Sequence, residues 1–292
     1  MSNYEKKLYG KIAEVVSDVC NNPAIHFSET DIHVLMMKAL MEIGCLKKMK
    51  DTNCTIGMNR DGGVSSTKYK TMLVHREYGH NDYKKATSDI VIFDEDDIET
   101  IDKDPRVLKS KGKYLKPKYI FEFGTEKVSG SKTRLKDEHL EEQWAKNRAK
   151  NIRGGKGKKY TVHIANDLQK LSKCKTEGFL IHIHRNYVQK HKNRKTIEKY
   201  QNEFKNVWEA WEKKAVVKML VFFVEIGVPA WYTKNKVKMF NPYPKEARDY
   251  LIDVNQRDIE CTIKNFLKGE NKDELDIKEI YANCNAKRLR KK

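Results

Sequence analysis

Apolar residues recur at helical spacing in the first part of the chain and gather into short runs further on. Residues 1–22 and 28–44 have the helical spacing, so two amphipathic helices are predicted there. In the second, Ser28 as N-cap with Asp31 three residues later forms an acidic variant of the capping box, and Gly44 fits the stop. The chain is therefore expected to begin with two helices that each bury one face.

Two short runs, residues 88–93 and 119–127, hold β-branched and aromatic residues at both odd and even positions, which is typical of strands covered on both faces. Further strands are predicted at 71–78, 160–164, 178–184 and 216–226, and further helices at 135–150, 166–173 and 192–214. The polar residues 47–70 are expected to form a loop or excursion, and residues 94–118 a long hairpin connection or a surface insertion. This order predicts an α/β fold in which helices flank a central mixed β-sheet.

The length of the chain suits one large domain with an appendage. Residues 1–232 are expected to form the main domain, and residues 233–292 a basic C-terminal extension that packs on the core or forms a recognition module. No apolar run approaches the ~20 residues of a membrane span, and the N-terminus lacks a secretory signal. Six cysteines without a CxxC pair indicate reduced thiols. A cytoplasmic protein without membrane association is therefore expected.

The charge of the chain favours a polyanionic partner. Lys and Arg number 59 against 41 Asp and Glu, which gives a net charge of +18. Neutralising phosphates with such residues releases counterions and strengthens binding to nucleic acid. The glycine-lysine segment 152–159 is expected to contact DNA phosphates through Lys156, Lys158 and Lys159. A general richness in lysine is the alternative explanation, because lysine is scattered along the whole sequence.

Each of the two apolar strands carries one carboxylate, Asp89 in the first and Glu122 in the second. Burying an unpaired carboxylate costs several kcal/mol, so a compensating partner is required. A divalent cation shared by Asp89 and Glu122 is the economical partner. A structural pair bridged to lysine is the alternative. His182 and His184 share one face of a predicted strand, but no third metal ligand is evident beside them.

The order of these acids resembles the PD-(D/E)XK nuclease superfamily. The resemblance rests on a capped helix with Glu29, a strand that ends in Glu77, and Asp89 and Glu122 in successive strands. Residues 165–172 with the strand after them also resemble the second helix–strand unit of that fold. The resemblance implies a restriction-endonuclease-like core with helical additions. It also implies Mg²⁺, or Mn²⁺ in its place, held by Asp89 and Glu122 for phosphodiester hydrolysis.

The sequence departs from the family pattern at Gly124, where a lysine would normally follow the second acid by two residues. Lys127 is the favoured replacement, because a bulge at Gly124 would let it reach the site. Lys118 is expected on the same strand face as Glu122, but at roughly 3.3 Å per residue it lies far from Glu122 along the strand. The third option is a group on the following helix, either Gln143 or Lys146.

Three further acids complete the predicted site. Glu77 is expected to take part in catalysis, since its strand adjoins that of Asp89. Glu29 is a possible auxiliary acid, although a first-turn carboxylate also stabilises a helix dipole without any catalytic role. Glu126 shares the strand face of Glu122 and is expected to act as an additional ligand or to support one.

The leading hypothesis is a Mg²⁺-dependent DNA endonuclease of the restriction or defence type. Cutting both strands with one site per chain favours a homodimer. The main alternative is a non-catalytic nucleic-acid-binding protein on a decayed nuclease fold, which the missing lysine at position 124 supports. An interaction protein whose charge is only compositional is the third hypothesis.

Overall fold

The structure is a computed structural model. It describes residues 1–23, 28–47, 50–58, 64–79, 87–94, 116–124, 167–168, 170–171, 176–188, 217–227, 236–242, 250–269 and 277–290. None of the helices in these ranges combines the length and the apolar composition that a bilayer crossing requires.

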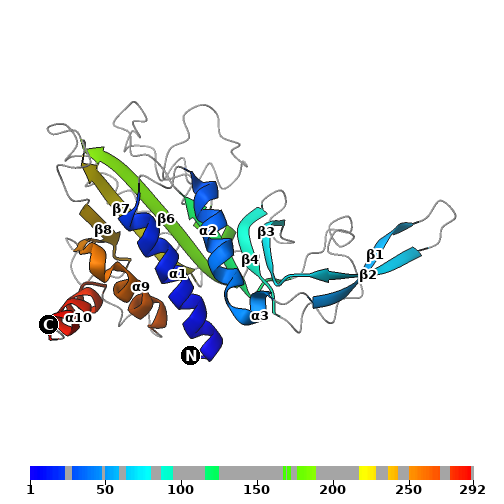
Figure 1. The fold of residues 1–292 in the computed structure, drawn as a ribbon. Coiled ribbons are helices and arrows are strands. Elements are labelled where there is room, and N and C mark those ends of the chain that lie inside the picture. The colour runs from blue at the N-terminus through cyan, green and yellow to red at the C-terminus, as the bar shows by residue number, and fades with distance from the viewer. Residues whose placement is uncertain are drawn as a thin grey trace.

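A seven-stranded mixed sheet forms the centre of the molecule (Figure 1). Its strands, in spatial order, are β3 (Val74–Gly79), β4 (Thr87–Ile92), β5 (Tyr119–Gly124), β6 (Glu177–Val188), β7 (Val217–Gly227), β8 (Lys236–Phe240) and β9 (Leu251–Val254). The first three pair antiparallel, β5, β6 and β7 run parallel, and β8 and β9 are again antiparallel. The predicted α/β class with a central mixed sheet is therefore confirmed.

Apart from a short helical segment at residues 167–168 and 170–171, the described helices lie on one face of this sheet (Figure 1). They are α1 (Asn3–Asn21), α2 (Glu29–Met41), α3 (Gly44–Lys47), α9 (Ile259–Lys268) and α10 (Ile277–Leu289), with a 3-10 turn η4 (Gln256–Asp258). Helix α1 packs between α2 and α9. The capping box predicted at Ser28 and Asp31 is confirmed, since Ser28 Oγ accepts from the Asp31 N–H and the Asp31 carboxylate accepts from the Ser28 N–H. Gly44 does not end α2 directly; it begins the short helix α3.

Residues 47–70 were expected to form a loop or excursion, and the expectation of a loop is wrong. Strands β1 (Lys50–Met58) and β2 (Val64–Thr71) pair antiparallel in a ribbon that is separate from the large sheet and extends away from it (Figure 1). The glycine-containing residues 59–63 connect the two strands. The sequence of the ribbon is rich in threonine, which has high strand propensity, but it lacks the apolar alternation that marks a half-buried strand.

The prediction that the β5 strand is covered on both faces is confirmed, because every residue from Tyr119 to Gly124 is buried. Phe121 stacks on Phe179 of β6 with ring centroids 4.8 Å apart. Tyr9 of α1 contacts Phe179 edge-on, and His33 of α2 lies 5.1 Å from Phe123. The helices thus cover the face to which Phe121 and Phe123 point. Strand alternation directs Glu122 and Gly124 to the opposite face.

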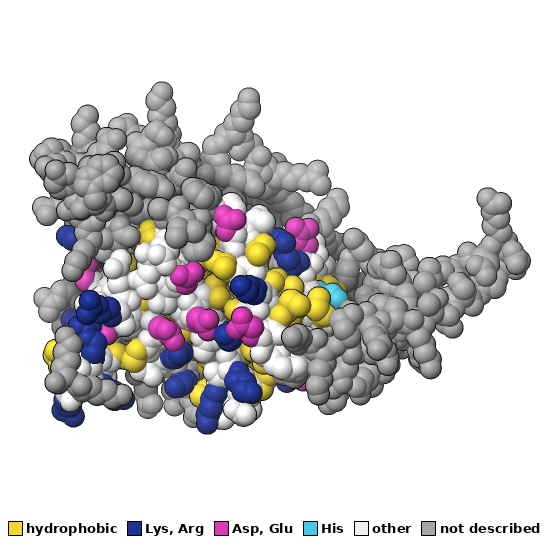
Figure 2. Space-filling view, viewed as in Figure 1, with side chains coloured by type: hydrophobic (Ala, Val, Ile, Leu, Met, Phe, Trp, Pro, Cys, Tyr) yellow, Lys and Arg dark blue, Asp and Glu magenta, His cyan; other side chains and the backbone are white. Residues whose placement is uncertain are grey.

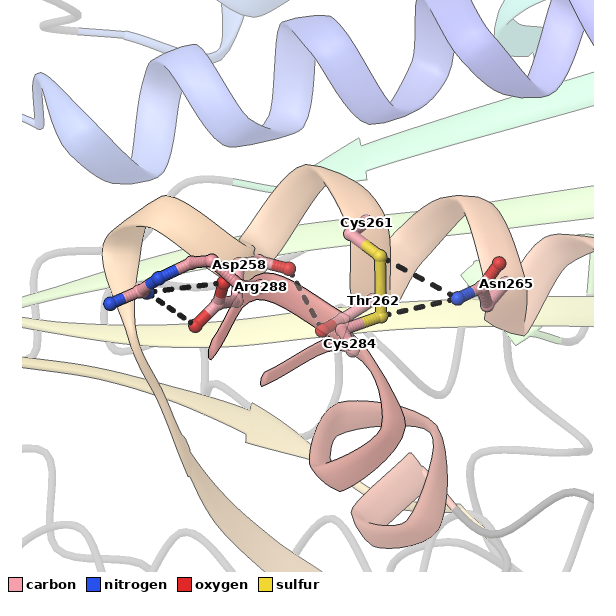
Figure 3. Close-up of a disulfide and its surroundings, with 6 residues drawn as sticks. All are labelled: Asp258, Cys261, Thr262, Asn265, Cys284 and Arg288. Carbon is pink, nitrogen blue, oxygen red and sulfur yellow. Dashed lines mark hydrogen bonds and ion pairs between the residues drawn. A yellow bond between two sulfur atoms is a disulfide. The ribbon is translucent and has the colours of Figure 1, made fainter. Parts of the chain in front are cut away.

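The C-terminal part of the chain joins the same sheet. The predicted boundary at residue 232 falls between β7 and β8, which pair side by side, and α9 packs against α1. Helix α10 is tied to α9 by a disulfide between Cys261 and Cys284, and the Asn265 amide donates to both sulfurs (Figure 3). The expectation of reduced thiols is therefore wrong for this pair. The two cysteines could not be paired from their spacing in the sequence, because only the packing of α10 against α9 brings them together.

Replacing Cys284 with serine is expected to lower the free energy of unfolding by about 3 kcal/mol, the chain-entropy value for a loop of this size. The two cysteines are 23 residues apart in sequence. Urea unfolding of the variant checks this, with the wild-type protein in reductant as a matched control that should show the same loss. An unchanged midpoint in both would contradict the prediction.

Two histidines, the buried His184 and the partly buried His75, make the stability depend on pH. Burial lowers the pKa of His184 well below its ordinary value and also lowers that of His75. Each group therefore binds fewer protons in the folded state than in the unfolded chain. Stability is fully present above the unfolded pKa near 6.5 and falls as the pH drops below it, by up to about 1.4 kcal/mol per pH unit and group.

His184→Leu is accordingly expected to flatten the decline in unfolding free energy between pH 6.5 and 5. Urea unfolding of both proteins at pH 7, 6 and 5 measures this slope. Carboxylates contribute equally to both curves, so the difference between the curves isolates His184. Identical slopes would show that His184 does not resist protonation.

Candidate metal centre

Asp89 lies where β4 and β5 separate. The last paired positions are Ile90 and Phe121, so Asp89 and Glu122 occupy the next row of the sheet. In this row the Asp89 Oδ2 atom accepts a hydrogen bond of 2.7 Å from the Phe123 backbone N–H. This bond replaces a backbone pairing and holds the carboxylate at the carboxyl end of β5. The structure thus brings the two principal predicted ligands to adjacent strands in the same row.

Glu122 is completely buried in the centre of the sheet, with a relative exposure of 0%. Its Oε2 atom accepts a hydrogen bond from the Lys170 ammonium, whereas Oε1 is buried and has no hydrogen-bond partner among the described residues. Burial raises the pKa of Glu122 well above its ordinary value, and the charges of Asp167 and Asp89 raise it further against the opposing effect of Lys170. An orphaned buried carboxylate oxygen is costly unless another group binds it.

Lys170 connects Glu122 to a second buried acid. It lies in a short helical segment with Asp167, and its Nζ is 3.2 Å from Asp167 Oδ1. The other oxygen of Asp167 is 3.1 Å from His182 Nε2 on β6. Although burial favours the protonated acid, Lys170 and His182 hold the pKa of Asp167 below its ordinary value. The pKa of Lys170 is raised by Glu122 and Asp167 in spite of burial.

Sequence reasoning did not identify Lys170 or Asp167. The only indication was their spacing, because residues three apart in a predicted helix lie on one face and pair readily. That spacing is common on solvent-exposed helices, so it could not distinguish this pair from others. His182 was considered only as half of a metal pair with His184, and the structure instead directs its ring to Asp167.

Helix α2 supplies a second group of side chains on the other side of Asp89. Ligand atoms of Glu29, His33 and Asp89 lie within 4.8 Å of one another, the only such group among the described residues. Glu29 Oε1 is 3.8 Å from His33 Nε2, which is 3.6 Å from Asp89 Oδ2. Burial raises the pKa of Glu29, and the Asp89 charge adds to this effect. Asp89 is therefore close to one further acid on α2, Glu29, and adjoins the strand of the buried Glu122.

The tautomer of His33 follows from its neighbour Arg76. The Arg76 guanidinium lies 3.1 Å from His33 Nδ1, and a guanidinium can only donate. His33 Nδ1 is therefore the acceptor, and the neutral ring carries its proton on Nε2. A protonated Nε2 has no lone pair for a metal, so Glu29 and Asp89 supply the metal-binding atoms of this group as oxygens only.

Glu77 lies on the strand that adjoins that of Asp89, as predicted. By register it stands opposite Asp89, between the pairs Arg76–Ile90 and Tyr78–Ser88, but it is exposed. Its backbone φ of 50° is uncommon for a residue other than glycine. Glu77 does not belong to the group that Glu29 and His33 form with Asp89.

Lys118, one alternative source of the missing lysine, lies at the opposite end of β5. Its Nζ pairs with Asp94 at 2.6 Å, so it is engaged away from Glu122. The other predicted residues on this part of the chain lie outside the described residues; they are Glu126, Lys127, Gln143, Lys146, Lys156, Lys158 and Lys159.

Comparisons of the chain with protein-family models, with curated proteins and with solved structures give no match.

Proposed function

We propose that the chain is a metal-dependent nuclease of the PD-(D/E)XK type that hydrolyses DNA, with Asp89 and Glu122 as its cation ligands. The observation that carries this proposal is the buried Oε1 of Glu122, which lies in the row of Asp89 and has no hydrogen-bond partner in the part of the chain that the structure describes. Without a ligand at this position, the buried carboxylate oxygen would lower the stability of the protein with no compensating interaction.

The order of elements supports the proposal. Helix α2 precedes three antiparallel strands, β3, β4 and β5, and the helical residues around Lys170 precede β6, which runs parallel to β5. The resemblance in sequence leads us to expect this order of helix, three strands, helix and parallel strand for a restriction-endonuclease-like core. The two principal acids then fall on its second and third strands.

The donor atoms suit a hard cation. Carboxylate oxygens from Asp89, Glu122 and Glu29 are the type of ligand that Mg²⁺ and Mn²⁺ bind, whereas the nearby His33 presents a protonated nitrogen. Burial first, and then neighbouring negative charge, raises the pKa values of Glu29 and Glu122, and a bound cation would favour their ionised forms. The residues present therefore fit Mg²⁺ better than Zn²⁺.

When bound, such a cation would neutralise charge on the phosphate and lower the pKa of a nucleophilic water. The chain's own residues prepare the site for it. The Phe123 N–H orients the Asp89 carboxylate, and Lys170 orients that of Glu122. The surrounding apolar strands exclude bulk water from Glu122, which strengthens electrostatic interactions there.

The net charge of +18 supports a nucleic acid as substrate. Acidic and basic side chains are interspersed on the described part of the helical face in Figure 2, so the positive excess is not concentrated there. We therefore expect DNA to approach the end of β5 where Asp89 and Glu122 lie. A restriction or defence role and a homodimer that cuts both strands are parts of this proposal.

The test is incubation of the purified protein with plasmid and linear DNA in Mg²⁺, Mn²⁺ or EDTA, with an RNA of equal length in parallel. Cleavage of DNA in either metal and none in EDTA is expected. Cleavage confined to RNA would change the substrate class. The absence of cleavage in every arm would overturn the nuclease proposal.

A non-catalytic nucleic-acid-binding protein is the second candidate, favoured by the glycine at position 124. It predicts binding that survives EDTA, falls steeply with salt and leads to no cleavage. A filter-binding titration over a range of salt concentrations, read beside the cleavage assay, separates the two functions.

A further inference from the structure

The His182 ring fills the space that a side chain at position 124 would need. Gly124 and His182 are register partners on β5 and β6, and a Cβ placed on Gly124 would lie 2.5 Å from both Cε1 and Nδ1 of the His182 ring and 2.9 Å from its Nε2. These separations are well below the 3.5–4.0 Å of favourable carbon contacts. No side chain can therefore stand at position 124 while His182 keeps its place. This is the position at which the family resemblance would put a lysine.

The ring that excludes a side chain from position 124 also begins a chain of polar contacts. His182 Nε2 contacts Asp167 Oδ2 at 3.1 Å, and Asp167 Oδ1 contacts Lys170 Nζ at 3.2 Å. Lys170 then donates to Glu122, the residue two positions before Gly124. The His182 ring thus fills the space that a lysine at position 124 would need. Through its contact with Asp167, it helps to place the Lys170 ammonium, which comes from a helical segment, beside Glu122.

We propose that Lys170 is the catalytic lysine of the site and that His182 and Asp167 are its positioning residues. The inference rests on the proposed nuclease function. Lys170 also donates to the Thr87 carbonyl at 3.4 Å, an exposed and long bond. A phosphate oxygen of the substrate can replace Thr87 as the third acceptor, while Glu122 and Asp167 hold the other two N–H groups.

A purely structural role for Lys170 is the competing explanation, since neutralising Glu122 alone would account for the ion pair. The two explanations differ in what the loss of the ammonium changes. A catalytic ammonium sets the cleavage rate of the folded protein, and it can be supplied from position 124 once His182 is removed, because residues 122 and 124 face the same side of β5. A purely structural ion pair sets the melting temperature, so restoring it would raise stability without raising the single-turnover rate of the folded protein.

The first experiment measures single-turnover cleavage by Lys170→Ala, with Lys118→Ala as the matched control. Loss of one stabilising donor typically costs about 10²–10³-fold, so a loss of that size is expected for Lys170→Ala, with unchanged DNA affinity. Lys118→Ala removes a lysine paired to Asp94 outside the site and should cleave normally. Normal cleavage by Lys170→Ala would overturn the inference and leave the nuclease function intact. Absence of cleavage by the wild type would overturn both.

The second experiment relocates the lysine. The triple variant Lys170→Ala, His182→Ala, Gly124→Lys should cleave at least about tenfold faster than Lys170→Ala, His182→Ala, a partial recovery of the lost donor's contribution. If the triple variant folds but cleaves no faster than the double variant, a lysine at position 124 does not replace Lys170, and that part of the inference is overturned.

His182→Gln keeps an N–H donor for Asp167 and should retain more kcat than His182→Ala, which keeps none. Equal rates for these two variants would overturn the positioning role.

A third readout needs neither metal nor activity. In EDTA, Gly124→Ala should lower the melting temperature by several degrees, because its methyl group meets the His182 ring. The same substitution in a His182→Ala background should have almost no effect. Equal shifts in the two backgrounds would show that the ring does not exclude a side chain at position 124, which would overturn the structural basis of the inference.

Discussion

Asp89→Asn is expected to reduce the rate of DNA cleavage by about 10³-fold or more, while the fold and the affinity for DNA in EDTA stay unchanged. The substitution keeps an oxygen that can accept the Phe123 N–H, so the separation of β4 from β5 is preserved. It removes only the negative charge. A cation stabilises a phosphoryl transition state by several kcal/mol, and each 1.36 kcal/mol corresponds to a factor of ten.

Asp94→Asn is the matched control for this variant. Asp94 follows the same strand but pairs with Lys118 at the opposite end of β5. It should therefore cleave at the wild-type rate under single-turnover conditions with Mg²⁺. Full activity of Asp89→Asn would remove Asp89 from the site, and equal losses in both variants would indicate a general effect of charge on DNA binding.

Glu122→Gln is expected to abolish both cleavage and stabilisation of the protein by Mg²⁺. A ligand that binds only the folded state stabilises it by about 2.7 kcal/mol at a hundredfold excess over its Kd, so the wild type should melt several degrees higher in Mg²⁺ than in EDTA. Glutamine retains an oxygen for Lys170 but lacks the charge that holds a cation. The melting temperature of the variant should therefore be the same in Mg²⁺ and EDTA.

Glu177→Gln provides the comparison for Glu122. Glu177 lies on the neighbouring strand β6, where it accepts from Tyr9 at 3.0 Å and pairs with Lys218 at 3.2 Å. Its loss should lower the melting temperature equally in Mg²⁺ and EDTA and leave the difference between them unchanged. Retention of that difference in Glu122→Gln would contradict the assignment of Glu122 as a ligand.

Local features of the sequence were sufficient for much of the fold. The helices α1 and α2, the capping box at Ser28 and the buried strands around Asp89 and Glu122 all follow from spacing and composition within a few residues. The two acids could be singled out because an apolar strand makes a carboxylate costly, and that cost is visible without knowing what lies nearby.

Contacts between distant segments could not be predicted in the same way. Lys170 meets Glu122 across 48 residues of sequence, and its place depends on the parallel pairing of β5 and β6. The position of Gly124 suggested a missing lysine, but only the position of the His182 ring explains why a side chain is excluded there. The Cys261–Cys284 disulfide likewise depends on the packing of α10 against α9.

The unusual backbone of Glu77 bears on the behaviour of the protein in concentrated solution. Strand β3 forms one end of the seven-stranded sheet, and an end strand with a straight row of backbone donors and acceptors can recruit strands from other molecules. The positive φ at Glu77 interrupts that row, and the adjacent exposed Arg76 adds a second charge at the same place. Among the described residues β3 has a neighbouring strand on one side only, and these two features are expected to disfavour its pairing with strands of other molecules.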